Sequence, residues 1–172
     1  MFPLDADPSL PAASTEVAAA LRDVMVTGLQ VRIRLEEACK QERITFAHYN
    51  VLRILHHAGR LGCPRSAIDA RMLDPGADVT RLMTTLEKRG LARRERDARD
   101  RRIMLHRITE AGQQLVVTLE AAFDRVYAHY AQRMAPRDAT HLSRICTGLF
   151  SDYKADDPGT LIRQNLEPKQ TT

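Results

Sequence analysis

Apolar residues recur along the chain with two different periods, and the change of period locates its helices and strands. Spacings of three and four residues, typical of helices, run through 14–41, 45–59, 66–73, 79–90, 109–130 and 136–149. Two short runs, 91–96 and 103–108, flank a charged hexapeptide and predict two strands joined in a hairpin. We therefore expect a mainly α protein with a small β-hairpin, in the order helix, helix, short helix, helix, hairpin, helix, helix.

Residues that favour helix ends lie at the borders of these segments. Those expected to begin a helix are Thr45, Ser66 and Thr109, as N-caps, and Pro136, in a first turn. Gly59 and Gly90 follow the second and fourth helices, where a left-handed residue commonly ends a helix. The sequence Asp74-Pro75-Gly76 predicts a turn between the third and fourth helices.

The first helix has a heptad-like apolar stripe that is too long for a small core to cover. Its residues are Val17, Leu21, Val24, Gly28, Val31, Leu35 and Ala38, and the sixth helix has a shorter face of Leu142, Ile145 and Leu149. We expect part of the stripe to pack against a second subunit, although a long amphipathic core helix would show the same spacing. The resulting division is a flexible arm (1–13), a helical dimerisation region (14–41 plus 109–153), a lobe that holds the hairpin (44–108) and a polar tail (154–172).

Positive charge is concentrated between Lys88 and Arg107. This stretch has nine basic residues and three acidic ones, an excess of six, whereas the whole chain has a net charge of +4. Eight of the nine basic residues are arginine, whose planar fork suits phosphate groups. A solvated loop can have such a composition too, but the bias towards arginine favours an anionic partner such as nucleic acid.

The third helix, the turn and the fourth helix form a helix-turn-helix arrangement, whose second helix fits the major groove of DNA. The polar face of the fourth helix carries Thr80, Arg81, Thr84, Thr85 and Lys88. Small hydroxyl side chains allow close approach to bases, and an arginine can fork onto guanine. Any amphipathic helix has a polar face, so the adjoining hairpin carries the argument. Its tip contains the candidates Arg99, Asp100, Arg101 and Arg102, and guanidinium groups on a narrow projection can enter the minor groove.

Asp100 is unexpected among the cations of this tip. We expect its carboxylate to hold the guanidinium of Arg102, which lies two positions along an extended chain and therefore on the same side. The ion pair would neutralise one positive charge of the tip and would fix the orientation of the Arg102 side chain. The alternative is an exposed ion pair of about 0–1 kcal/mol.

Several motifs together resemble the MarR family of multiple-antibiotic-resistance-type regulators. They are Asp78-Val-Thr-Arg-Leu-Met, Leu86-Glu-Lys-Arg-Gly-Leu91, Arg94, Asp100-Arg-Arg102 and Ile108-Thr-Glu-Ala-Gly112. The match is most specific over residues 78–112, and the order of helices extends it to roughly 15–153.

The resemblance implies a winged helix-turn-helix fold with N- and C-terminal dimerisation helices. It also implies a homodimer that binds double-stranded DNA at a pseudo-palindromic operator and that represses transcription, as most members do. Many members release DNA when a small phenolic or aromatic acid binds between lobe and dimer stem. By motif position, Arg81, Thr84 and Thr85 fall in the recognition helix, and Asp100 and Arg102 fall in the wing. The pair Thr84-Thr85 departs from the Asp-Arg pair often found there, which affects the base contacts rather than the fold.

An effector site is expected where the first, second and fifth helices meet. The candidate ligand-binding residues are Arg34, Tyr49, Arg53, His56, His57 and Arg60. Arginine and histidine can hold a carboxylate, and tyrosine can stack or donate a hydrogen bond. Each of these residues taken singly is more often ordinary amphipathic surface.

Other functions have weaker support. A thiol-oxidation sensor could use Cys39 or Cys63 on the same scaffold. A winged-helix protein-interaction module would not require the arginine-rich hairpin. No GxSxG, HExxH or P-loop motif supports an enzyme, and the candidate metal ligands lack tight spacing, so we expect neither a metal nor a cofactor. Three scattered cysteines, no secretion signal and no apolar run of 18 residues predict a cytoplasmic protein without a membrane span.

Overall fold

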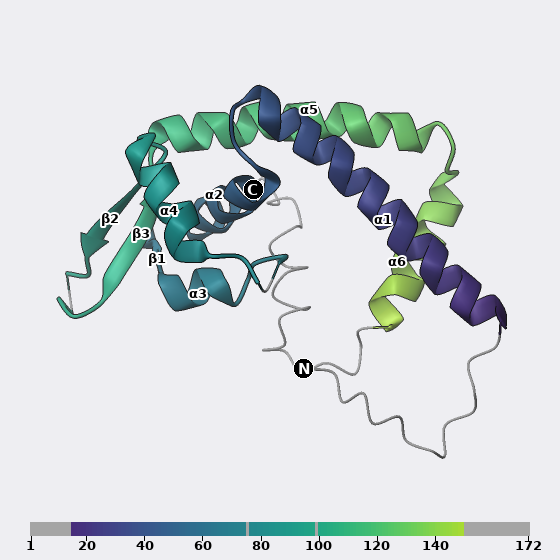
Figure 1. The fold of residues 1–172 in the computed structure, drawn as a ribbon, viewed down its shortest axis with the longest axis horizontal. Coiled ribbons are helices and arrows are strands. Elements are labelled where there is room, and N and C mark those ends of the chain that lie inside the picture. Colours follow the sequence, from purple (N-terminus) through teal and green to yellow (C-terminus); the bar gives the residue numbers. More distant parts are fainter. Residues whose placement is uncertain (1–14, 75, 99, 150–172) are drawn as a thin grey trace, which may run out of the picture. The chain divides into compact units, whose positions relative to one another are not determined.

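The computed structural model describes residues 15–74, 76–98 and 100–149, and it has the mainly helical architecture with a small antiparallel sheet that the sequence predicts (Figure 1). The elements are α1 (Thr15–Gln41), α2 (Phe46–Ala58), a 3-10 turn η1 (Gly59–Leu61), β1 (Cys63–Pro64), α3 (Arg65–Asp69), α4 (Val79–Lys88), β2 (Ala92–Arg96), β3 (Met104–Ile108), α5 (Glu110–Ala131) and α6 (Pro136–Gly148). The predicted arm (1–13), the predicted tail (154–172) and Arg99 lie outside the described residues.

The chain divides into two compact units between Arg34 and Leu35, inside α1. In the first unit, the described part of α1 has no buried residue. In the second unit, the last turns of α1 bury Leu35 and Cys39. The stripe along the first helix is therefore covered at its C-terminal end and open along the part that precedes Leu35.

The core of the second unit is built around α2. Eight of the thirteen residues of α2 are buried, and the helix contacts α4, α5 and β3. Tyr49 meets Phe123 of α5 edge-on, with ring centroids 4.7 Å apart, and Phe46 lies 6.1 Å from the same ring. Burial of apolar surface contributes about 25 cal/mol per Å², so this packing is the main force that holds α5 and α4 on α2.

Most of the predicted helix ends are confirmed. The side chain of Thr45 accepts a hydrogen bond from the main-chain N–H of His48, and the His48 side chain accepts one from Thr45 in return, which completes a capping box. Thr109 caps α5 by accepting from the main-chain N–H of Gly112. Gly59 directly after α2 and Gly90 two residues after the end of α4 have positive φ angles of 58° and 70°, where a side chain would be strained.

The third helix and the sheet differ from the sequence prediction. The helix α3 begins at Arg65, with Pro64 rather than Ser66 at its N-cap, and it ends at Asp69, so Met72 and Leu73 lie beyond it. The reason is the additional strand β1, which immediately precedes α3 and pairs with β3. A strand of two residues carries no detectable alternation, so only the tertiary pairing defines it.

The sheet has the order β1-β3-β2, with both pairings antiparallel. Gly62 allows β1 to approach β3. It has a φ of 66°, and a Cβ atom at this position would lie 2.7 Å from the main-chain oxygen of His106. A residue with a side chain would therefore be both strained and in collision, so a glycine is required where the chain joins the sheet.

Two of the helices assigned to dimerisation, α1 and α6, expose apolar side chains. On α1, Val17, Leu21 and Leu29 are 50–55% exposed. None of the residues of α6, all of which the structure describes, is buried, and Leu142 and Ile145 are 39% and 48% exposed. Pro136 occupies the first turn of α6 as predicted, so the helix forms as expected, but the residues that the structure describes do not bury its apolar face.

Candidate nucleic-acid interface

The helix α4 is held on the core by one face and leaves the other free. Asp78 caps it, accepting a hydrogen bond of 3.0 Å from the main-chain N–H of Arg81. Val79, Met83 and Leu86 are buried, and α4 contacts α2, α3 and β2. Because these contacts come from three elements, the direction in which the opposite face points is fixed by the fold.

The opposite face of α4 contains the residues that the sequence predicts. Thr80, Arg81, Thr84 and Lys88 are exposed and Thr85 is half-buried. The hydroxyl of Thr84 donates to the main-chain oxygen of Thr80, and that of Thr85 donates to the main-chain oxygen of Arg81, at 2.9 and 3.1 Å. A threonine side chain whose hydroxyl donates its proton in this way still has acceptor lone pairs on the oxygen and a methyl group. This pair is therefore suited to accept from amino groups of bases or to contact a thymine methyl group.

Arg65, which the sequence analysis did not select, extends this face onto α3. Its guanidinium donates to the hydroxyl of Thr80 at 3.1 Å and lies 3.5 Å from the carboxylate of Asp69. Arg65 and Thr80 are fifteen residues apart in sequence, and the expected start of the third helix at Ser66 placed Arg65 outside the motif. The position of α3 against α4 is what brings it to the interface.

The tip of the hairpin is held by carboxylates that accept from the main chain. Asp97 accepts from the main-chain N–H of Asp100, and Asp100 accepts from the main-chain N–H of Arg102, both at 2.9 Å. The expected contact between Asp100 and the guanidinium of Arg102 is therefore replaced by a turn in which Asp100 shapes the backbone. The physical reason is that the chain turns at this point and is not extended.

Two arginines of the tip carry their charge in solvent. Arg101 and Arg102 are exposed. Arg96 at the end of β2 is also exposed, and its guanidinium donates to the main-chain oxygen of Arg101 at 3.0 Å. The wing thus has a braced backbone and cationic side chains in solvent, which is the arrangement that an anionic groove requires.

Glu87 ties α4 to the wing. One of its oxygens lies 3.7 Å from Nε of Arg94 on β2, and the other lies 3.6 Å from Nδ1 of His106 on β3. Burial lowers the pKa of His106, against the opposing effect of Glu87, which raises it. The lowered pKa of His106 disfavours the imidazolium, so the electrostatic link between α4 and the wing is mainly the ion pair of Glu87 with Arg94.

Arg89 ties α4 to the turn between α1 and α2. Its guanidinium donates to the main-chain oxygens of Arg43 and Glu42, at 2.7 and 3.0 Å. Arg43 has a positive φ of 57°, an uncommon conformation for a residue with a side chain. Arg89 is adjacent to Lys88 in sequence, but its guanidinium is hydrogen-bonded to main-chain oxygens of its own chain. Lys88 is exposed, and its ammonium group is available to a partner.

Comparisons with known proteins agree with this geometry. Residues 44–103, which span the helix-turn-helix and most of the wing, match the MarR family. The match assigns this lobe, residues 44–103, to the MarR family of DNA-binding transcription regulators.

Solved structures of low sequence identity have the same fold. AbsC, a MarR family transcriptional regulator from Streptomyces coelicolor, is 20% identical with a TM-score of 0.70, and the match covers 81% of this chain and 95% of that one. The YusO protein from Bacillus subtilis is 21% identical with a TM-score of 0.57, over 81% and 99% of the two chains. The S. aureus MepR-DNA complex is 20% identical with a TM-score of 0.65, over 78% and 96%. A search of curated proteins finds no match.

The candidate effector residues of the second unit do not form one site. Tyr49 and Arg53 are buried together, because the guanidinium of Arg53 donates to the Tyr49 hydroxyl at 3.0 Å and lies 3.6 Å from Glu120. His57 contacts the main-chain oxygen of Arg53 through Nδ1, at 2.9 Å. Arg34 is exposed and ends the first unit.

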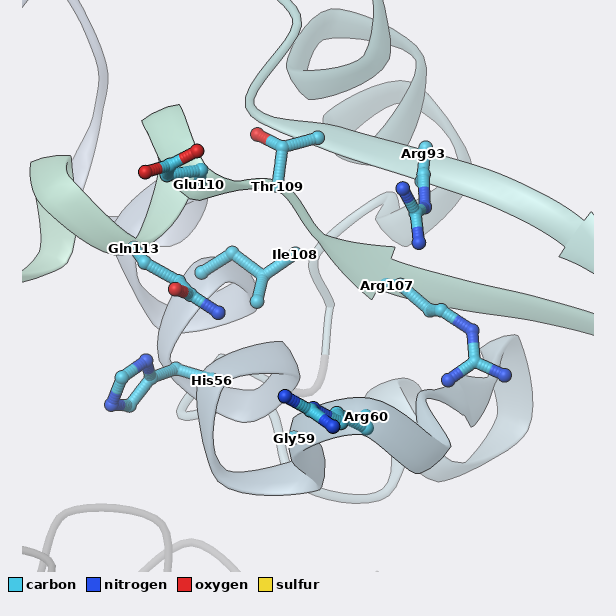
Figure 2. A pocket seen from close by; sticks show the side chains of 9 residues that line it. All are labelled: His56, Gly59, Arg60, Arg93, Arg107, Ile108, Thr109, Glu110 and Gln113. Carbon is cyan, nitrogen blue, oxygen red and sulfur yellow. The ribbon is translucent and has the colours of Figure 1, made fainter.

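His56 and Arg60 lie elsewhere, at an open pocket of about 720 Å³. Figure 2 shows its other lining residues, which come from η1, from β2 and β3 and from the start of α5. They are Gly59, Arg93, Arg107, Ile108, Thr109, Glu110 and Gln113. Sequence reasoning missed the two strand arginines, since they are separated from Arg60 by more than thirty residues and only the sheet brings them to it.

Cys39 and Cys63, the two candidates for a thiol sensor, are both buried. Burial, reinforced by Glu36, raises the pKa of Cys39 to about 12. Burial also raises the pKa of Cys63, against the opposing effect of Arg71. Because the thiolate is the reactive form, burial disfavours the reactive form of both thiols.

No group of three metal-binding side chains is found among the residues that the structure describes. Within the same ranges, no helix has the length and apolar character needed to cross a membrane.

Proposed function

We propose that this chain is a sequence-specific regulator that acts as a homodimer on a pseudo-palindromic operator in double-stranded DNA, and that it represses transcription until a small effector releases it. The observation that carries the proposal is the exposed face of α4 beside the braced, cationic wing. The first presents hydroxyls and Arg81, and the second presents Arg101 and Arg102. A helix and a narrow projection of this kind fit the major and minor grooves respectively.

The contacts divide into two classes. Arg81, Thr84 and Thr85 are suited to read base edges, because a forked guanidinium matches guanine and small hydroxyls permit close approach. Lys88, Arg101 and Arg102 are suited to phosphates or to the narrow minor groove, where the potential is most negative. Removing a residue of the first class should relax sequence preference, and removing one of the second should lower affinity for every sequence.

The homodimer is supported by apolar surface that remains exposed among the residues that the structure describes. Val17 and Leu21 on α1, and separately Leu142 and Ile145 on α6, are each at least 39% exposed. Monomeric proteins rarely expose contiguous apolar patches of this kind, and the heptad-like spacing on α1 is typical of helices that pack against each other. Two lobes in such a dimer would read two half-sites one helical turn apart.

The effector is expected to be a phenolic or aromatic acid, as the family resemblance implies. Tyr49 and Arg53 are hydrogen-bonded to each other and buried, so an acid that bound to these two residues would have to displace that contact. Arg34, His56, His57 and Arg60 remain the other predicted ligand-binding residues.

The test is to select fragments of the source genome that the purified protein binds and to measure the affinity for the best one across a salt series. We expect a two-fold symmetric site and a logarithm of affinity that falls linearly with the logarithm of salt concentration. Sedimentation velocity on the same samples should show one dimer per site. A monomer that ignores DNA at low ionic strength would contradict the proposal and would favour a protein-interaction module.

A further inference from the structure

The pocket at the base of the wing is separate from the surface of α4. Arg94 and His106 are paired across β2 and β3, and both contact Glu87 of α4. Side chains alternate between the two faces of a strand, so the adjacent pair, Arg93 and Arg107, lies on the opposite face of the sheet. Figure 2 shows these two arginines on neighbouring strands, near Arg60 on η1. The pocket is thus behind the wing with respect to the recognition helix.

Positive charge at this pocket exceeds what its neighbours neutralise. Glu95 is shared by two arginines, since its carboxylate lies 3.9 Å from Nε of Arg93 and also contacts Nε of Arg107. Glu110 lies in the first turn of α5, where the helix dipole already stabilises its charge. Arg60 forms no ion pair with any residue that the structure describes.

The position of two arginines of this pocket also destabilises the sheet. Arg93 and Arg107 are directly opposite each other on antiparallel strands, and like charges in that position are destabilising. The side chain of Arg107 is only 22% exposed, so its charge is incompletely screened by solvent. An anion placed among the guanidinium groups would relieve this repulsion.

The remaining lining has the character of a ligand site. Ile108 is 8% exposed and provides an apolar surface, and Gln113 supplies an amide. The volume of about 720 Å³ lies within the range of about 300–1,000 Å³ that is typical of small-molecule sites. A small organic anion fits both the size and the charge.

We propose that this pocket binds a small anion whose carboxylate or phosphate oxygens accept hydrogen bonds from Arg60 and Arg107 while its remaining part lies against Ile108. The bound anion competes with Glu95 for Arg107. Because Glu95 and Arg107 lie on the two strands of the wing, occupancy changes the pairing that positions the wing tip. The assignment of the anion as an effector rests on the proposed function, whereas its binding does not.

The experiment measures binding of sodium benzoate and of sodium phosphate by titration calorimetry, at an ionic strength held constant with sodium chloride. We expect at least one probe to bind with a Kd on the order of 1 mM or tighter. Arg60→Gln should weaken that binding at least about tenfold, the size of a lost charge-assisted hydrogen bond. The matched control is Arg137→Gln, which removes the same charge from an α6 side chain that is 89% exposed and lies outside the pocket.

The two probes distinguish the source of the anion: benzoate binding alone indicates an aromatic carboxylate, and phosphate binding alone indicates a phosphorylated ligand. Amide NMR shifts should locate either probe at Gly59–Leu61 and Thr109–Gln113. Failure of both probes to saturate the wild-type protein, or equal weakening in Arg60→Gln and Arg137→Gln, would overturn the proposal. Operator affinity of the wild-type protein is measured without either probe, so that a failure of DNA binding counts against the proposed function and leaves the anion result to be judged separately.

Discussion

The helices α4 and α6 are both short and amphipathic, but their apolar faces are used differently. In α4, Val79, Met83 and Leu86 are buried against the rest of the lobe. In α6, none of the residues is buried, and Ile145 is 48% exposed. An amphipathic pattern therefore predicts that a face will be covered, but it does not say whether the covering element belongs to the same chain. The difference divides this protein into a lobe that one chain completes and an outer surface that we assign to a partner copy.

The largest expected effect tests this division directly. Leu86 is fully buried and Leu142 is 39% exposed, so Leu86→Ala should lower the free energy of unfolding by about 2–5 kcal/mol, the usual cost of a truncated core leucine. Leu142→Ala should lower it less, and its effect should depend on protein concentration, because a subunit interface stabilises by mass action. The measurement is guanidinium unfolding at two protein concentrations. Equal losses that do not depend on concentration would show that α6 packs within its own chain.

The second comparison concerns two exposed arginines. Arg102→Ala in the wing should weaken operator binding by about 1–3 kcal/mol and reduce the slope of affinity against salt. Arg137→Ala on α6 should change neither quantity, since its side chain is 89% exposed and is not among the residues proposed to contact DNA. Fluorescence anisotropy across a salt series checks both variants. An unchanged affinity in Arg102→Ala would remove the wing from the DNA interface.

The third comparison separates two neighbours at the end of α4. Lys88→Ala should reduce the salt slope by about one, as expected for a lost phosphate contact. Arg89→Ala should weaken binding without changing that slope, because its guanidinium is bound to the main-chain oxygens of Glu42 and Arg43. Arg89→Lys should not restore affinity, since an ammonium group lacks the fork that reaches both oxygens. If Arg89→Ala lowers the slope as much as Lys88→Ala does, then Arg89 contacts DNA directly.

The smallest expected effect is a pH dependence of stability. Burial lowers the pKa of His106 below its usual value of 6.5, so the unfolded chain binds a proton more readily than the folded one. The contribution of His106 to stability is therefore present above pH 6.5 and is lost as the pH falls through the lowered folded pKa. His106→Gln should flatten the decline in stability between pH 7 and pH 5, whereas His141→Gln on the exposed α6 should not. Urea unfolding at several pH values provides the measurement, and parallel curves for all three proteins would contradict it.

Local signals were sufficient for most of the secondary structure. The caps Thr45 and Thr109 and the terminating glycines Gly59 and Gly90 act on their own helices through contacts within a few residues. The start of α3 was predicted wrongly, because it depends on β1, and β1 exists only through its pairing with β3, about forty residues later. Local chemistry cannot reveal an element of two residues that is held by a distant strand.

The candidate DNA-binding residues on α4 were accessible to sequence reasoning for the same reason. The side on which Arg81 and Thr84 lie follows from helical periodicity once Val79 and Leu86 are assigned to the core. Asp100 was correctly assigned to the wing, but the group that its carboxylate contacts was predicted wrongly. The direction of that carboxylate depends on the turn that the backbone makes.

The amino-acid order by itself determined which segments become helices or strands and which of their faces are apolar, because these properties arise from neighbours three or four positions away. The tertiary structure alone decided which distant groups meet. It brought Arg65 to Thr80, Arg89 to the turn that ends at Arg43, and Arg60 to the strand arginines behind the wing. Such meetings depend on how packed elements are oriented, and orientation is settled by the burial of the whole core rather than by any local preference.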